Sequence, residues 1–180
     1  MWCSSYYKKP ASALLLILLL TMVKGAFAAS WREELPAATP LGSGEFRWFG
    51  FRVYTARLWS EQRPFTASAP FALELTYHRS ISRERFVSTS LDEIKRLSGK
   101  EYSKAQLARW QAEMERAFSD VESGDQLIGV YLPGVGCRFY GKKGLNAEVA
   151  DTEFAKAFFA IWLDERSKDS NLRAQLLGQK

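Results

Sequence analysis

The chain has 180 residues, with 25 lysines and arginines against 20 aspartates and glutamates. Removal of residues 1–28 would take away three lysines and leave a net charge of +2. So small a charge, with no basic cluster interleaved with aromatic rings, argues against a nucleic-acid partner.

Residues 1–28 have the features of a cleaved signal peptide. Two lysines precede an apolar run at residues 13–23, and residues 26–28 read Ala-Phe-Ala, which suits a signal peptidase. The apolar run is shorter than the roughly 20 residues that a bilayer span needs. We therefore expect a mature chain that begins near Ala29, has no membrane span, and is periplasmic or secreted.

Residues 29–180 have the length of one domain, which buries roughly 70% of the surface that its unfolded chain exposes. Their one cysteine, Cys137, cannot form an internal disulfide. We interpret it as a small buried side chain, because no histidine lies near it in the sequence to support a nucleophile.

The first part of the mature chain predicts strands. Two prolines make residues 29–40 irregular, and the glycines at 42 and 44 predict a turn. Two short strands are expected within residues 45–59, with a break at Gly50. Residues 71–77 then alternate apolar and polar side chains, which is the clearest strand pattern in the chain.

Two amphipathic helices are predicted next. Ser82 can cap the first helix, whose apolar residues recur at helical spacing up to Leu97. Ser103 begins the second helix with a capping-box pattern, and its apolar stripe reaches Phe118.

A second block of strands and helices follows. Glycine-rich turns separate three short apolar segments, which predict an antiparallel meander. The predicted elements are strands at 127–132, 137–140 and 145–149 and helices at 152–163 and 172–177. Because strands and helices cluster instead of alternating, we expect an α+β fold with an antiparallel sheet and helices over one face.

Large rings are concentrated in these strands and helices. A sheet–helix interface so rich in aromatic side chains is either a packed core or a core with a cleft. The residues alone favour the packed core, because packing is the usual role of such rings.

Few residues offer catalysis or metal binding. The one histidine, His78, cannot build a multi-histidine metal site, and no cysteine cluster replaces it. No serine-elbow motif or glycine-rich phosphate loop is present. We therefore expect no metal and no cofactor.

Arg47 is the remaining candidate for binding. A guanidinium is always charged and offers a planar fork of donors that suits a carboxylate or an enolate oxygen. With aromatic neighbours on both sides, Arg47 is expected to be half-buried and to need a partner. That partner is either a ligand or an internal carboxylate such as Glu45 or Glu74. Arg138 is a second candidate of the same kind.

The chain resembles the chalcone isomerase-like family over residues 35–178, and its exported bacterial branch most closely. Glycines precede Arg47, the strand Val53-Tyr54-x-Ala56-x-Leu58-Trp59 follows it, and residues 151–163 carry the most specific motif. The other matching motifs are Ala69-Pro70-Phe71-Ala72-Leu73-Glu74-Leu75, Gly124-Asp125 and Pro133-Gly134-x-Gly136.

This resemblance implies an open-faced β-sandwich, in which a large antiparallel sheet carries a layer of helices on one face and a cleft lies between them. It also implies that Arg47 lies in the cleft, where the family's arginine faces the oxyanion of the isomerase reaction or the carboxylate of a fatty acid. Tyr54 takes the position of a threonine in the isomerase.

The enzyme's tyrosine, lysine and asparagine lie on the helix after the third strand, and residues 82–91 here contain no tyrosine or asparagine. Such donors supply most of the acceleration in an oxyanion-stabilising site. The leading hypothesis is therefore an exported, non-catalytic protein that binds a small amphipathic carboxylate such as a fatty acid, through Arg47 and Tyr54. The alternatives are an isomerase that acts on a chalcone-like unsaturated ketone, and an interaction or scaffold protein without a ligand.

Overall fold

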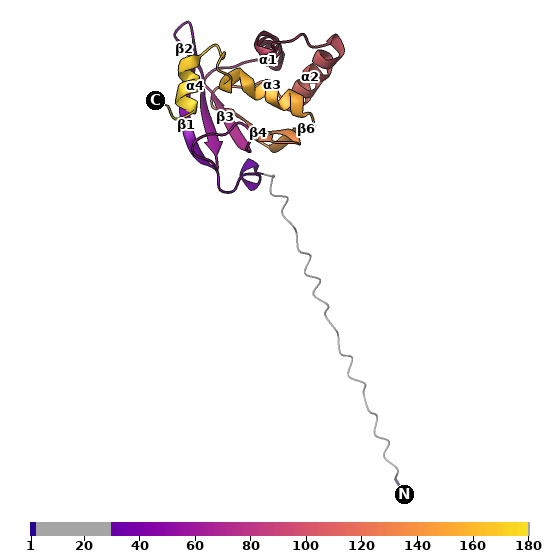
Figure 1. Cartoon of the computed structure of the whole chain (residues 1–180). Helices are drawn as coiled ribbons and strands as arrows, with labels where there is room; N and C mark the ends of the chain where they lie inside the picture. The colour runs from indigo at the N-terminus through magenta and orange to yellow at the C-terminus, as the bar shows by residue number, and fades with distance from the viewer. Residues whose placement is uncertain (3–29, 180) are drawn as a thin grey trace.

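A computed structural model describes residues 1–2 and 30–179 of the chain (Figure 1). The predicted signal peptide lies almost entirely outside these residues and stays a prediction. Within the part of the chain that the structure describes, no helix is long and apolar enough to cross a membrane.

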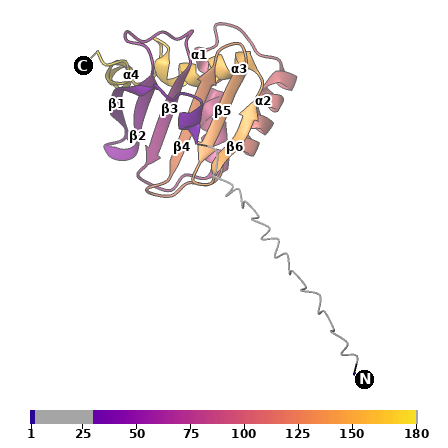
Figure 2. The same cartoon turned by 90° about the horizontal axis from the view of Figure 1, so that it is seen from below.

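Six antiparallel strands form a single sheet in which each strand pairs with its neighbours in sequence (Figures 1 and 2). The strands are β1 (Thr39–Trp48), β2 (Phe51–Ser60), β3 (Phe71–Tyr77), β4 (Gln126–Leu132), β5 (Gly136–Gly141) and β6 (Gly144–Val149). The predicted meander is thus the second half of one continuous sheet, and the predicted break at Gly50 is the turn between β1 and β2.

Four helices cover one face of this sheet (Figure 2). They are α1 (Arg83–Leu97), α2 (Lys104–Ala117), α3 (Thr152–Leu163) and α4 (Ser170–Leu176). The helix α3 packs on β5, α2 on β6 and α4 on β1, whereas α1 packs mainly on α2 and α3. Ser82 and Ser103 cap α1 and α2 as their sequences predict.

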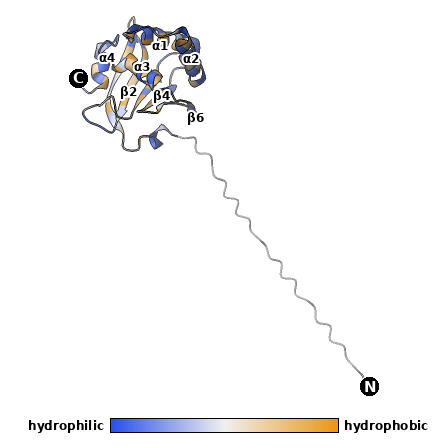
Figure 3. Cartoon of the chain, turned by 45° about the vertical axis from the view of Figure 1, so that its right-hand side comes forward, coloured by the Kyte–Doolittle hydropathy of each residue, from blue (hydrophilic) through white to orange (hydrophobic). Residues whose placement is uncertain are grey.

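The main core lies between the sheet and the helices. Phe139, on β5, makes edge contacts with rings of α3 and with Phe118, at centroid distances of 5.1 Å to Phe118 and 5.1 Å to Phe158. The outer side of α2 is largely hydrophilic, as Figure 3 shows. The apolar stripe of α2 that is read from the sequence therefore faces the core.

A smaller core covers the opposite face of the sheet. The 3₁₀ helix η1 (Trp31–Glu33) lies there and places Trp31 against Trp59 of β2, with ring centroids 5.3 Å apart. The guanidinium of Arg32 stacks on both rings, 4.5 Å from Trp31 and 4.3 Å from Trp59. The predicted irregular segment at 29–40 thus contains this helix and the beginning of β1.

The glycines at 42 and 44 form no turn, which corrects the expectation from the sequence. Both lie within β1, because α4 crosses this strand too closely for a side chain. A Cβ atom on Gly42 would lie 2.0 Å from the backbone oxygen of Gln175, well inside van der Waals contact.

Candidate functional site

A cavity of about 540 Å³ opens between the β1–β3 end of the sheet and the helices α1, α3 and α4. This volume lies within the range of small-molecule sites in proteins. Its lining includes aromatic, charged and small polar side chains, among them Phe46, Trp48, Tyr54, Tyr77, Arg79, Arg85, Thr89, Ser90, Glu93 and Trp162. The fold therefore has a packed core and, beside it, a cleft.

Short side chains of α1 keep this space open. Arg85, Thr89 and Glu93 recur at a spacing of four, and Phe86 and Ser90 lie beside them, so these residues form one stripe along the helix. All of them line the cavity. Because Thr89 and Ser90 are small, the stripe does not reach the sheet as a row of large apolar side chains would.

Two tyrosines from the sheet form part of the cavity wall. The hydroxyl of Tyr54 accepts a hydrogen bond from Nε1 of Trp162 at 2.9 Å, and burial raises its pKa. Tyr77 lies edge-on to Tyr54, and its buried hydroxyl has no hydrogen-bond partner among the described residues. Burial also raises the pKa of Tyr77, so both phenols are neutral hydrogen-bonding groups at physiological pH.

Two arginines contribute positive charge to the cavity lining. Arg79 follows β3 and lies over the ring of Phe51, 5.5 Å from its centroid. Arg85 lies in the first turn of α1, where a cation opposes the helix dipole. Within residues 30–179, neither guanidinium makes an ion pair or a hydrogen bond. Both guanidinium groups are therefore available to an anion.

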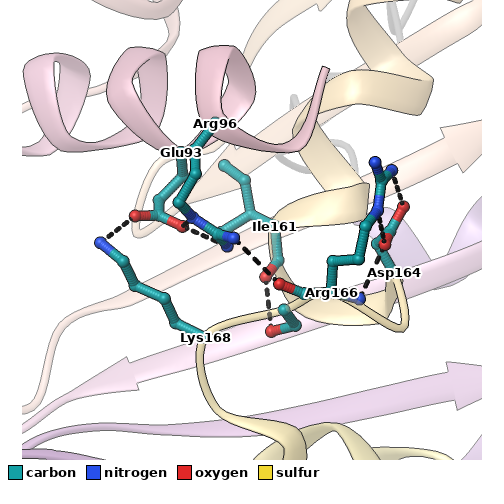
Figure 4. Close-up of polar contacts among 7 residues, drawn as sticks. Glu93, Arg96, Ile161, Asp164, Arg166 and Lys168 are labelled. Carbon is teal, nitrogen blue, oxygen red and sulfur yellow. Dashed lines mark hydrogen bonds and ion pairs between the residues drawn. The ribbon is translucent and has the colours of Figure 1, made fainter. Parts of the chain in front are cut away.

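The acidic group at the other end of the α1 stripe is neutralised (Figure 4). The carboxylate of Glu93 accepts a hydrogen bond from Nε of Arg96 at 2.9 Å and forms a second ion pair with Lys168. Burial raises the pKa of Glu93, but the hydrogen bonds from Lys168 and Arg96 outweigh this effect and lower it. Arg96 also donates to the backbone oxygen of Arg166 at 3.0 Å, which ties α1 to the loop after α3.

Asp169 is the other acidic residue of the lining. Its side chain caps α4 by accepting a hydrogen bond from the backbone N–H of Leu172 at 2.8 Å. With Glu93 paired and Asp169 at a helix cap, the cavity presents an excess of positive charge to a ligand.

Arg47 does not line the cavity, and the expectation that it is half-buried in the cleft is corrected. Phe46 lies on the helix side of β1 and stacks on Tyr54 at 5.1 Å, so the next side chain along the strand projects from the opposite face. On that face Arg47 pairs with Glu45 at 2.8 Å, and 54% of its side chain is exposed. This is the internal ion pair that the sequence left open as an alternative.

The other residues considered from the sequence also lie outside the cavity. The ring of His78 contacts the hydroxyl of Thr55 at 2.7 Å. Cys137 is buried, and its burial raises the pKa of the thiol, as expected for a packing residue and not for a nucleophile. Arg138 pairs with Glu148 at 2.7 Å and with Glu34. Among the described residues, no cluster of potential ligands could hold a metal ion.

Tyr54 is thus the one predicted binding residue that lines the cavity, and Tyr77, Arg79 and Arg85, which line it as well, were not singled out from the sequence. A signal for Arg85 was present. The stripe of α1 that begins at Arg85 carries small polar residues beside the apolar positions of the core face, which is unusual for a helix that covers a hydrophobic core.

Three comparisons place the chain among known proteins. A family described as chalcone isomerase-like matches residues 42–178. An uncharacterized protein of Haemophilus influenzae is 30% identical over 166 residues, which cover 92% of this chain and 77% of that protein. The crystal structure of a fatty-acid binding protein of Arabidopsis thaliana superposes with a TM-score of 0.62 at 13% identity, over 85% of this chain and 91% of that one. The family match spans most of the chain, and the plant protein has the same α+β fold.

Proposed function

The chain belongs to the chalcone isomerase-like family, and on this premise we propose that it binds a small amphipathic carboxylate, such as a fatty acid, without catalysis. The observation that carries the proposal is the cavity of about 540 Å³, whose lining includes the guanidinium groups of Arg79 and Arg85, which make no ion pair with any residue that the structure describes. The fold that the chain shares with a fatty-acid binding protein supports it.

The ligand's carboxylate would lie at Arg79 and Arg85. A charge-assisted hydrogen bond from a guanidinium to a carboxylate is about twice as strong as a neutral one. Arg47, which pairs with Glu45 on the far face of β1, has no part in this arrangement.

The hydrocarbon tail would extend between the sheet and α1. Phe46, Leu75, Phe86 and Ile161 offer it apolar surface, and each buried methylene contributes roughly 0.8 kcal/mol. Tyr54 and Tyr77 also line the cavity; the hydroxyl of Tyr77 is buried and has no hydrogen-bond partner among the described residues.

Thermal unfolding of the delipidated mature protein tests this proposal. Saturated fatty acids of increasing chain length should raise the melting temperature progressively until the cavity is filled. Primary alcohols of the same lengths are the matched control and should raise it less, because they lack the anion that Arg79 and Arg85 attract. Equal shifts for acids and alcohols, or no shift for either, would contradict the proposal.

We propose also that the protein acts outside the cytoplasm, in the periplasm or after secretion, because residues 1–28 have the pattern of a signal peptide. Sequencing of the N-terminus of the protein isolated from cell fractions tests this. A mature N-terminus near Ala29 in the extracytoplasmic fraction is expected, and an intact Met1 in the cytosol would refute it.

Isomerisation of a chalcone-like unsaturated ketone is the second candidate, because two tyrosines with neutral hydroxyl groups, Tyr54 and Tyr77, line the same cavity. A hydroxyl donor can stabilise a developing oxyanion. Loss of the visible absorbance of chalcone on incubation with the protein, abolished in Tyr77→Phe, would favour this activity over simple binding.

A further inference from the structure

The turn between β1 and β2 exposes three aromatic rings at the tip of a hairpin. Trp48 pairs with Phe51 across the two strands, and Phe49 and Gly50 form the turn itself. The exposed fractions are 55% for Trp48, 85% for Phe49 and 63% for Phe51. We call residues 48–51 the aromatic tip.

The backbone conformation of the turn is unfavourable for Phe49. Phe49 has a φ of 48° and Gly50 a φ of 81°, as a two-residue turn with positive φ at both positions requires. Glycine, asparagine and aspartate adopt this conformation readily, whereas a bulky residue such as phenylalanine rarely does. The chain therefore holds a large exposed ring at a position where a small polar residue would fold more easily.

Arginines surround the aromatic tip. Arg47 and Arg52 share one carboxylate, that of Glu45, at 2.8 and 2.6 Å. Arg79 lies over the ring of Phe51 without an ion pair among the described residues. Three cations thus face one anion around the rings, and the tip has a positive charge.

We propose that the aromatic tip docks the protein on a lipid bilayer that contains anionic lipids. Tryptophan and phenylalanine insert favourably at the boundary between headgroups and acyl chains, and the arginines would lie among the anionic headgroups. Exposed rings with a rim of arginine match the chemistry of this boundary.

A second copy of the chain or a globular partner fits the tip less well. Aromatic side chains bury roughly 150–250 Å² each, so three rings that are already partly covered offer less than the about 800 Å² that each partner contributes to a stable protein interface. A projecting hairpin turn is also convex, so a folded partner would contact only part of it, whereas the lipids of a bilayer can surround it.

Docking would place the cavity at the membrane. Trp48 belongs to the aromatic tip and Arg79 lies beside it, and both residues also line the cavity. An amphipathic molecule could then pass between the bilayer and the cavity without crossing water. The docking itself does not depend on which ligand the cavity holds.

Co-sedimentation of the mature protein with vesicles tests the inference. One set of vesicles contains phosphatidylcholine alone, and the other contains phosphatidylcholine with phosphatidylglycerol. The protein should sediment with the anionic set, less so as salt rises. Phe49→Asn and Phe51→Ser should each weaken this binding about tenfold, because each removes one inserted ring.

The controls separate docking from folding and from ligand binding. Phe49→Asn should unfold at the same temperature as the wild type or higher, because asparagine tolerates the positive φ. Leu145→Ser removes another exposed apolar side chain, 45% exposed on β6 at the opposite edge of the sheet, and should leave vesicle binding unchanged. Phe49→Asn should also keep the melting shift with fatty acids, since Phe49 does not line the cavity.

Three results would overturn the inference. The first is that the wild type sediments with neither set of vesicles. The second is that Phe49→Asn binds as the wild type does, or that Phe49→Asn and Leu145→Ser lose binding equally. The third is concentration-dependent self-association through the tip on size-exclusion chromatography, with no vesicle binding.

Discussion

The hydroxyls of Tyr54 and Tyr77 are chemically identical and differ in their surroundings, which makes them a matched pair. Tyr54→Phe removes an acceptor from Nε1 of Trp162 and should lower the free energy of unfolding by about 1 kcal/mol. Tyr77→Phe removes a buried hydroxyl without a partner among the described residues and should leave stability unchanged or raise it by about 1 kcal/mol. Urea unfolding of both variants measures the difference, and an equal loss in both would mean that the Tyr77 hydroxyl has a partner in solution.

Arg85 and Arg47 should differ in their effect on fatty-acid binding, because only Arg85 lines the cavity. Arg85→Ala should weaken fatty-acid binding about three- to tenfold, because it removes a cation that would pair with the carboxylate. It should not lower stability, since a cation in the first turn of α1 opposes the helix dipole. Arg47→Ala is the control and should leave the affinity unchanged. Isothermal titration with a fatty acid measures the affinity of both variants. A loss of affinity in Arg47→Ala alone would show that Arg47, the residue predicted from the sequence, binds the carboxylate.

The direction of Arg47 could not be predicted from residue type. Its aromatic neighbours suggested a half-buried setting, but a strand alternates its side chains between two faces. Phe46 and Trp48 line the cavity, so the residue between them points away from it. The packing of the helices on β1 decides which alternate side chains of this strand face inward. That packing is a tertiary property.

At the scale of elements, the contact between α4 and β1 depends on the glycine at position 42. Gly42→Ala should lower the free energy of unfolding by about 1 to 3 kcal/mol, because the new Cβ would lie 2.0 Å from the backbone oxygen of Gln175 and α4 would have to move. Gly99→Ala is the matched control. Gly99 lies between α1 and α2 with open space at its Cβ position, so the free energy of unfolding of this variant should hardly change. Equal effects of the two substitutions in urea unfolding would show that α4 does not pack tightly on β1.

Most helices and strands could be predicted because their patterns are local. Alternation over residues 71–77 gave β3, and serine caps with an apolar stripe gave α1 and α2. The glycines of β1 were misread as a turn because the helix that requires them is α4, more than 120 residues further along the chain. The cavity could not be predicted from the sequence either, because it depends on the distance between α1 and the sheet.

At the scale of the whole molecule, the helix layer divides the inner face of the sheet into a filled part and an open part. Helices α2 and α3 pack directly on β6 and β5, where phenylalanine rings fill the space. Helix α4 packs on β1, and α1 packs mainly on the other helices. The cavity lies over the end of β2 and β3 that carries Tyr54 and Tyr77, whereas Phe71 at the other end of β3 packs on Phe159 of α3.

The stability of the protein should depend on pH through Glu93. Its ion pairs with Arg96 and Lys168 join α1 to the loop after α3 (Figure 4). The pKa of Glu93 is lowered from 4.5 in the folded state, and that of Asp164 in the same loop region is lowered to about 2 by its hydrogen bond with Arg166. A carboxyl group whose pKa falls on folding stabilises the protein above its unfolded pKa and loses that contribution as pH falls. Stability should therefore be level from pH 7 to about pH 5 and decline between about pH 5 and pH 2.

Glu93→Gln should lower the free energy of unfolding at pH 7 by about 1 to 2 kcal/mol, because Lys168 and Arg96 lose their shared carboxylate. The difference from the wild type should shrink as the pH falls below about 4.5, because the lowered pKa of Glu93 means that the unfolded wild type then takes up a proton more readily than the folded one. Asp92→Asn is the control, since Asp92 is the preceding acidic residue of α1 but 71% of its side chain is exposed in its pair with Lys95. Urea unfolding at several pH values gives the comparison. A constant difference between Glu93→Gln and the wild type down to pH 2 would mean that the ion pair does not stabilise the fold, and that the loop after α3 is held to α1 by packing alone.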